Sequence, residues 1–295
     1  MTTPMDGSDA LNVGPTQDAR YPIAAENVAE MARLIKQARL MTERFSLFPE
    51  QIDLRGKQTI LDIGCGPGEW ALTVAKKYPW CQVIGIDISQ MMIEYARYTA
   101  AEQEIPNVDF RMMDASQPLQ FQDATFDLLH ARFISGFMSP GNWPRLLAEC
   151  LRRLRPGGVM CSLETDGMGV STSPSMMRYQ ALMVKVARMA GRDFISEGDR
   201  IGIMAVQARL LQNAGFVNIQ QQANVLNYSA GMPTHQTVVE DLGTFMKLIQ
   251  PFVLQMGLVS REDLEVLYNR AMEEMQREDF CAVSFGQTVW GEKPE

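Results

Sequence analysis

The chain has 295 residues, of which 46% are hydrophobic and 21% charged, and its formal net charge is −8 at pH 7. This composition is ordinary for a globular protein with a sizeable core, and the acidic balance argues against the broad basic face with which proteins bind nucleic acids. No stretch is long and apolar enough to span a membrane, and the beginning of the sequence lacks the basic start and apolar middle of a secretion signal.

The first 20 residues are polar and rich in small side chains, which predicts a flexible tail. Apolar residues then recur at helical spacing from Ala24 to Phe45, so we expect a helix ahead of the first strand. Tyr21 stands just before this helix, and Pro49 and the segment 53–56 lead into the core.

Short apolar runs alternate with amphipathic stretches over the middle of the chain. We expect strands at 60–63, 83–87, 108–112, 126–131 and 159–164, and helices at 70–77, 89–104 and 143–154. Ser89 is placed to cap the second helix, and the turn at 155–158 (R-P-G-G) to end the third. This alternation predicts a doubly wound α/β fold with a parallel sheet, in which ligands bind beyond the carboxyl ends of the strands.

After the fifth strand the alternation loosens. We expect a Met-rich loop and helix within 168–200, a helix at 203–213, a sixth strand at 217–228, a helical insertion, and a seventh strand at 280–290. Ser260 opens one helix of the insertion with a capping-box pattern. The expected division is therefore a tail (1–20), a leading helix (21–56), a core (57–167), a Met-rich segment with strand six (168–233), a helical cap (234–279) and a last strand with its tail (280–295).

The segment Thr59–Trp70 (T-I-L-D-I-G-C-G-P-G-E-W) has the form of a strand, a tight glycine turn and a helix. Such a turn lets a ligand approach the backbone at the positive end of a helix dipole. A second buried-type strand ends in Asp87, at the ~20-residue offset of a carboxylate that binds a ribose. Together these features predict a nucleoside site.

The glycine spacing narrows the choice of nucleoside. Dinucleotide-binding turns have the pattern G-x-G-x-x-G, whereas here the third glycine comes one residue early. Asp62, just before the turn, would repel a pyrophosphate but attract an ammonium group. S-adenosylmethionine (SAM) carries an ammonium and a sulfonium and has no phosphate.

With Asp62, Gly64, Gly66 and Gly68 in the first motif and Asp87 at the ribose position, the chain resembles the class I SAM-dependent methyltransferases over about residues 57–164. The resemblance implies a Rossmann-like, doubly wound, seven-stranded sheet, mostly parallel with an antiparallel last strand, and a helical cap over the pocket. It also implies roles for further side chains. Ile88 and Met92 would sandwich the adenine, Asp114 with Ala115 would meet its amino group, and Tyr21 would lie near the cofactor.

Strand four ends at His130-Ala131-Arg132-Phe133, the edge that faces the transferring methyl in the resembled family. His130 is therefore a candidate general base as well as a cofactor contact, and a structural histidine is the alternative. Glu164 and Asp166 are weaker base candidates, and Arg132 would hold an acidic group of the substrate or form an ion pair with a helix. In-line methyl transfer mainly requires alignment and exclusion of water, so a dedicated base is optional.

The expected function is transfer of a methyl group from SAM to a small, partly apolar organic molecule, without nucleic-acid or membrane partners. The alternatives are a regulatory SAM-binding protein, a nicotinamide oxidoreductase, and a protein or RNA methyltransferase; the last is disfavoured by charge and by the lack of an N-P-P-Y-like motif. The odd number of scattered cysteines, five without a C-x-x-C pair, favours reduced thiols in a cytoplasm and no metal site. The cap helices could also pair between subunits, which leaves the oligomeric state open.

Overall fold

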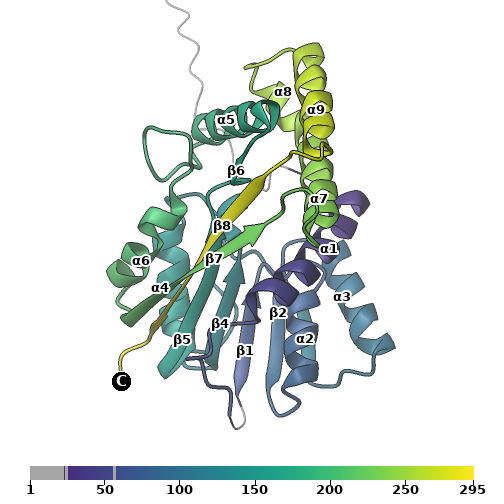
Figure 1. Ribbon diagram of the computed structural model, residues 1–295. Helices are drawn as coiled ribbons and strands as arrows, with labels where there is room; N and C mark the ends of the chain where they lie inside the picture. Colours follow the sequence, from purple (N-terminus) through teal and green to yellow (C-terminus); the bar gives the residue numbers. More distant parts are fainter. Residues whose placement is uncertain (1–22, 24–25, 56–57) are drawn as a thin grey trace, which may run out of the picture.

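The structure is a computed structural model that describes residue 23 and residues 26–55 and 58–295. Tyr21 and the tail predicted at 1–20 lie outside these residues. The described chain forms one twisted sheet with helices on both faces and a group of helices beyond the carboxyl ends of the central strands (Figure 1).

The sheet has the strand order β3-β2-β1-β4-β5-β8-β6, and β7 also pairs with β8. The first five strands are parallel, whereas β8 runs antiparallel to β5, β6 and β7. The strand bounds are β1 Thr59–Ile63, β2 Gln82–Asp87, β3 Val108–Met112, β4 Phe126–Arg132, β5 Leu154–Thr165, β6 Val170–Ser171, β7 Val217–Asn227 and β8 Ala282–Glu292. The Rossmann-like, mostly parallel sheet with an antiparallel last strand is therefore confirmed.

Two details of the sheet differ from the prediction. The described residues contain eight strands, because the two-residue strand β6 adds to the seven expected and is too short to leave a sequence pattern. Strand β5 also begins at Leu154, whose partner is Phe126 on β4, so the Pro-Gly-Gly segment that we expected to form a turn lies inside the strand. A register shift between Phe126 and Leu128 accommodates this early start.

The helices begin and end largely where the sequence predicts. Ser89 caps α3 by accepting a hydrogen bond from the backbone N–H of Met92, and Ser260 caps α9 through Asp263. The bounds are α1 Val28–Phe45, α2 Glu69–Lys77, α3 Gln90–Glu102, η1 Ile134–Gly136, α4 Trp143–Arg153, α5 Pro174–Met189, α6 Ile203–Ala214, α7 His235–Leu248, α8 Gln250–Gln255 and α9 Arg261–Met275.

The two faces of the sheet have separate cores. Ile60 of β1 packs with Trp70 of α2 on one face, and the next residue, Leu61, packs with Trp143 of α4 on the other. This alternation follows from the two-residue period of a strand. It predicts that Asp62 and Ile63 also project from opposite faces, which decides where the carboxylate of Asp62 lies.

A third core joins α1 to the helices that follow strand β5. Leu40 and Met41 of α1 are buried in an apolar cluster with residues of α5, α7, α8 and α9, which we call the cap cluster. Arg33 of α1 also bridges Glu30 (2.7 Å) and Asp241 of α7 (2.9 Å), and all three carry little exposed surface. Helix α1 therefore packs with the cap helices, whose group stands above the sheet in Figure 1.

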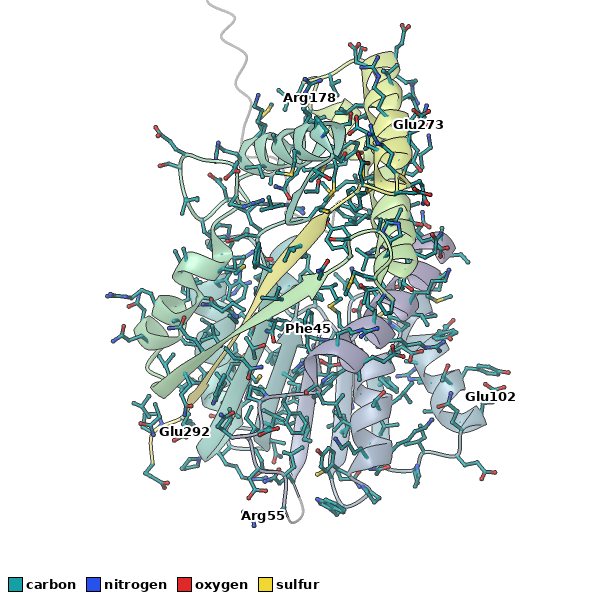
Figure 2. All side chains as sticks on the ribbon, viewed as in Figure 1. Phe45, Arg55, Glu102, Arg178, Glu273 and Glu292 are labelled. Carbon is teal, nitrogen blue, oxygen red and sulfur yellow. The ribbon has the colours of Figure 1, made fainter. Side chains whose placement is uncertain are left out.

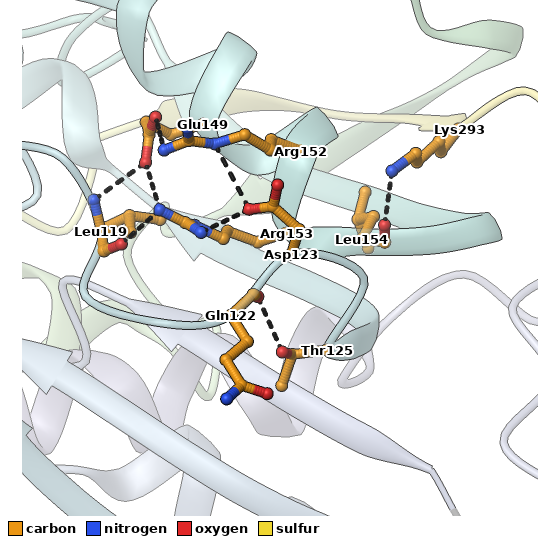
Figure 3. A network of polar contacts seen from close by, with 9 residues as sticks. All are labelled: Leu119, Gln122, Asp123, Thr125, Glu149, Arg152, Arg153, Leu154 and Lys293. Atoms are coloured by element: carbon orange, nitrogen blue, oxygen red, sulfur yellow. Dashed lines mark hydrogen bonds and ion pairs between the residues drawn. The ribbon is translucent and has the colours of Figure 1, made fainter.

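The arginines at the end of α4 hold that helix to the loop before β4 (Figure 3). Arg153 donates to Asp123 (2.6 Å), to the carbonyl oxygen of Leu119 (2.7 Å) and to Glu149 (3.1 Å). Arg152 pairs with the same Glu149 at 2.6 Å. These guanidinium groups are thus engaged in ion pairs, which disfavours this strip as a nucleic-acid surface.

Among the described helices, none combines the length and the hydrophobicity needed to cross a membrane.

Candidate functional site

The glycine turn between β1 and α2 forms the floor of the candidate site. The backbone N–H of Cys65 donates to the carbonyl oxygen of Ile86 on β2 at 2.9 Å, which holds the turn against the sheet. Gly68 has a φ of +84°, and a Cβ there would lie 2.7 Å from the ring of Phe110. A Cβ on Gly66 would meet only Leu34 of α1, at 4.0 Å. The turn is therefore tightly packed at Gly68 and open at Gly66, as a backbone that receives a ligand requires.

Asp87 ends β2 beside this turn. Its Oδ2 accepts the N–H of Gly66 and its Oδ1 accepts the N–H of Ser89, each at 2.9 Å. Burial raises the pKa of Asp87 and the nearby charge of Asp62 raises it further, while the two backbone donors lower it. A carboxylate has about four acceptor positions, so two remain for the hydroxyl groups of a ribose.

The predicted adenine contacts surround the ends of β2 and β3. Ile88 leaves 54% of its surface exposed next to the Asp87 carboxylate, whereas Met92 lies behind it with 3% exposed. The N–H of Met113 donates to the carbonyl oxygen of Asp87 at 2.8 Å, which brings Asp114 to the same edge. Asp114 accepts from the N–H of Ser116 at 2.8 Å, and Ala115 packs at the border of the core. An exposed apolar side chain beside a ribose-type carboxylate fits a nucleoside.

Asp62 and His130 form a buried pair on neighbouring strands. Nδ1 of His130 lies 2.8 Å from Oδ1 of Asp62, and its ring stacks on Trp70 with 3.6 Å between centroids and 3° between planes. Burial lowers the pKa of His130 despite the carboxylate, so the ring is neutral near pH 7 and donates its Nδ1 proton to Asp62. His130 is 2% exposed. This arrangement holds β1 and β4 together just before the glycine turn. That His130 acts as a base, and that Asp62 attracts the ammonium group of SAM, stay predictions.

The carboxyl end of β4 contains residues whose roles the sequence did not reveal. Phe133 has a φ of +57°, rare for a residue with a side chain, and its ring packs against the cap cluster. Phe137 covers the glycine turn, because its ring lies 3.0 Å from the position of a Cβ on Gly64. Glu164 accepts hydrogen bonds from Ile134 and Ser135. None of these contacts has a local sequence signal.

The segment ahead of α1 contributes a further unforeseen residue. The carboxylate of Glu26 accepts from Ser89 Oγ at 3.0 Å and from the N–H groups of Gln90 and Met91 at 3.1 Å each. It therefore caps α3 beside Asp87. Tyr21, which we expected near the cofactor, lies outside the described residues.

The described residues line two hollows, one of them away from the candidate site and one beside His130. One of about 540 Å³ lies at the amino ends of the strands and is lined by residues that include Trp80 and Arg55; Figure 2 labels Arg55 at that end. It contains none of the predicted site residues. The other, about 20 Å³, is lined by His130 and Arg132 and has room for roughly one water. Burial lowers the pKa of Arg132 to about 10, and its guanidinium donates to Thr42 of α1 at 3.4 Å.

Comparison with known proteins agrees with this geometry. Residues 60–158 match the family model described as a methyltransferase domain. The chain is 27% identical to a demethylmenaquinone methyltransferase of Lactiplantibacillus plantarum over 183 residues, 58% of this chain and 76% of that protein. It is 34% identical to a trans-aconitate 2-methyltransferase of Deinococcus radiodurans over 115 residues, 39% of each chain. A secondary metabolism regulator of Coprinopsis cinerea, laeA, is 24% identical over 232 residues, 72% of this chain and 54% of that one.

Solved structures share the fold. The YcgJ protein from Bacillus subtilis superimposes with a TM-score of 0.53 at 17% identity, covering 91% of this chain and all of that one. The phosphoethanolamine N-methyltransferase 2 of Haemonchus contortus, solved with SAM, gives a TM-score of 0.52 at 18% identity over 90% of this chain and 57% of that one. Several curated relatives are matched over only about two fifths to a half of their length.

The glycine turn, the ribose-type carboxylate and the family match all concern the same segment of the chain, and SAM is the cofactor that fits them. The nicotinamide reading is thereby set aside. Residues 60–158 therefore form a methyltransferase domain, and the chain as a whole has the fold of the SAM-dependent methyltransferases that it resembles.

Proposed function

We propose that the protein transfers a methyl group from SAM to a small, partly apolar organic molecule, within a pocket roofed by the cap helices. The observation that supports this most is the cap cluster, which lies beyond the carboxyl ends of β4 and β5 and includes Met168, Met176 and Tyr228. Methionine side chains are flexible and polarizable and adapt to apolar ligands. The names of the relatives, which refer to demethylmenaquinone and trans-aconitate, favour an organic acceptor of low molecular weight.

The residue roles follow from position. Asp87 would bind the ribose, and Ile88 and Met92 would contact the adenine, with Asp114 and Ala115 at its amino edge. The glycines at 64, 66 and 68 would receive the methionine part, whose ammonium group Asp62 would attract. SAM supplies a methyl group already activated by the positive sulfur. The protein's part is to align the acceptor and exclude water, so the fully buried His130 is not required as a base.

The test is transfer of label from methyl-labelled SAM to the small-molecule fraction of a cell extract. Label at low molecular weight supports the proposal, and mass spectrometry of the labelled product identifies the acceptor. Label in protein or RNA contradicts it. The matched control is Asp87→Ala, which removes the proposed ribose contact.

A regulatory role is the second candidate, and it is favoured by one observation: two relatives are named secondary metabolism regulators. Such a protein would bind SAM and transfer no label to small molecules. Binding of S-adenosylhomocysteine (SAH) without any labelled product at low molecular weight, across extracts from several growth conditions, would favour this candidate.

A further inference from the structure

The three-residue turn η1, at the carboxyl end of β4, is held by a buried carboxylate from the neighbouring strand. Glu164 has no exposed surface. Its Oε1 accepts the N–H of Ile134 at 2.9 Å, and its Oε2 accepts the N–H (3.3 Å) and the hydroxyl (2.6 Å) of Ser135. Three donors thus converge on one negative charge at the beginning of the turn, where N–H groups point outward.

The other end of η1 is held by a positive charge. Arg192 donates to the carbonyl oxygen of Gly136 at 2.8 Å, and its guanidinium lies 5.7 Å from the ring centroid of Phe252 on α8. The turn therefore has a carboxylate at its N–H end and a guanidinium at its carbonyl end. The second of these groups also connects it to the cap.

The turn transmits its position to the cofactor-binding segment. Ile134 and Phe137 are the side chains nearest to Gly64: a Cβ there would lie 3.0 Å from Phe137 and 3.5 Å from Ile134. Because protein interiors are close-packed, movement of η1 would shift this part of the glycine turn. On its other side Phe133 packs against the cap cluster, in a backbone conformation that costs free energy.

The surroundings keep Glu164 close to its protonated state. Burial raises the pKa of Glu164 to about 7, and the charge of Asp166, just after the end of β5, adds to this, while the hydrogen bonds from Ser135 and Ile134 lower it. The charged groups on the adjoining segments are Arg132 at the end of β4, Arg192, which follows α5 and donates to Gly136 of η1, and Arg200, whose charge acts on Asp166. A protonated carboxyl has fewer acceptor positions and must place its own O–H, so it holds three donors less well.

We propose that Glu164 is a positioning residue for the cofactor, whose carboxylate holds the η1 turn, and with it Phe137, against the glycine turn. This inference rests on the proposed function, because it assigns the glycine turn to the methionine part of SAM. The positioning role replaces the base role that the sequence suggested for Glu164. It involves no direct contact with SAM and no proton transfer.

The test is SAH binding by calorimetry at pH 8 and pH 6 for the wild type and Glu164→Gln. At pH 8 the variant should bind SAH on the order of 10-fold more weakly, the size of one charge-assisted hydrogen bond. Wild-type affinity should fall toward that of the variant at pH 6, whereas the variant should change little. A residue that only supports the fold would lower the thermal midpoint without this pH pattern.

Two further variants complete the experiment. Glu149→Gln is the matched control, because Glu149 also accepts a backbone N–H and arginine donors but belongs to the α4 network of Figure 3. It should keep wild-type SAH affinity and wild-type pH dependence. Ser135→Ala removes only the 2.6 Å hydroxyl donor, so it should weaken SAH binding less than Glu164→Gln does. Because this hydrogen bond lowers the pKa of Glu164, its loss should also move the fall in SAH affinity on acidification to higher pH.

Equal SAH affinity of the wild type and Glu164→Gln at both pH values would overturn the proposal, and so would equal weakening by Glu149→Gln. If Glu164→Gln does not fold, Ser135→Ala decides by the shift of its acid decline. A wild type that binds SAH with the expected pH dependence and labels no small molecule would contradict the proposed function while supporting the positioning role.

Discussion

Removal of the Asp87 carboxylate tests the assignment of the nucleoside site most directly. In Asp87→Ala, the N–H groups of Gly66 and Ser89 lose an acceptor at 2.9 Å each. Gly66 is partly exposed, so its N–H can be hydrated, whereas Ser89 is 2% exposed; the free energy of unfolding should therefore fall by about 2–4 kcal/mol. Two charge-assisted hydrogen bonds to a ribose, at about 1.5–3 kcal/mol each, predict that SAH affinity falls by at least about 100-fold.

Calorimetry with SAH and with a 2′-deoxy analogue separates the ribose contact from loosening of the turn. The analogue should bind more weakly than SAH to the wild type, and the two should bind alike to Asp87→Ala. Asp109→Ala is the control, because Asp109 is not one of the candidate site residues and pairs with Arg111 on the exposed part of β3. An SAH affinity of Asp87→Ala within about fivefold of the wild type would refute the assignment of the nucleoside site.

Four further outcomes are expected. Gly68→Ala should destabilise the protein by about 2–4 kcal/mol in chemical unfolding, because its Cβ would lie 2.7 Å from Phe110 at a φ of +84°. His130→Ala should keep SAH binding, and only a loss of transfer beyond about 100-fold would support the base role. Arg33→Met should cost about 3 kcal/mol of stability by breaking the buried bridge between α1 and α7, measured by urea unfolding. Glu164 keeps its proton to higher pH in the folded than in the unfolded chain, so its contribution to stability should fall by about 3 kcal/mol between pH 4.5 and 7, and Glu164→Gln should remove that slope.

The sequence predicted the sheet because each strand except the two-residue β6 carries its own signal. The runs ending at Ile63 and Asp87 are short, apolar and followed by helical spacing, and such local patterns determine a doubly wound fold. Strand β5 began early because pairing with β4 overrode the turn preference of Pro156 and Gly157. The N–H of Gly157 donates to the carbonyl oxygen of Lys293, and the N–H of Lys293 donates to that of Gly158. The local sequence does not reveal these distant partners.

The candidate site was predictable only where one residue identifies its own role. Asp87 ends a strand at a characteristic offset from the glycines; in the structure it accepts the N–H of Gly66, and its contact with a ribose stays a prediction. The contacts of Glu26 with α3 and of Glu164 with η1 join residues about 63 and 30 positions apart. Neither carboxylate lies in a pattern, so only the folded arrangement brings these groups together.

The packing of α1 with the cap has a consequence for synthesis of the chain. Arg33 and Asp241 are separated by 208 residues, and Leu40 and Met41 find their core among helices α5, α7, α8 and α9, which are all made much later. At ribosomal rates of roughly 5–20 residues per second, α1 emerges on the order of 10–40 s before its partner helix. Helix α1, the first of the described helices, should therefore be among the last of them to dock, after the parallel strands have assembled. During that interval its apolar face is open to chaperones.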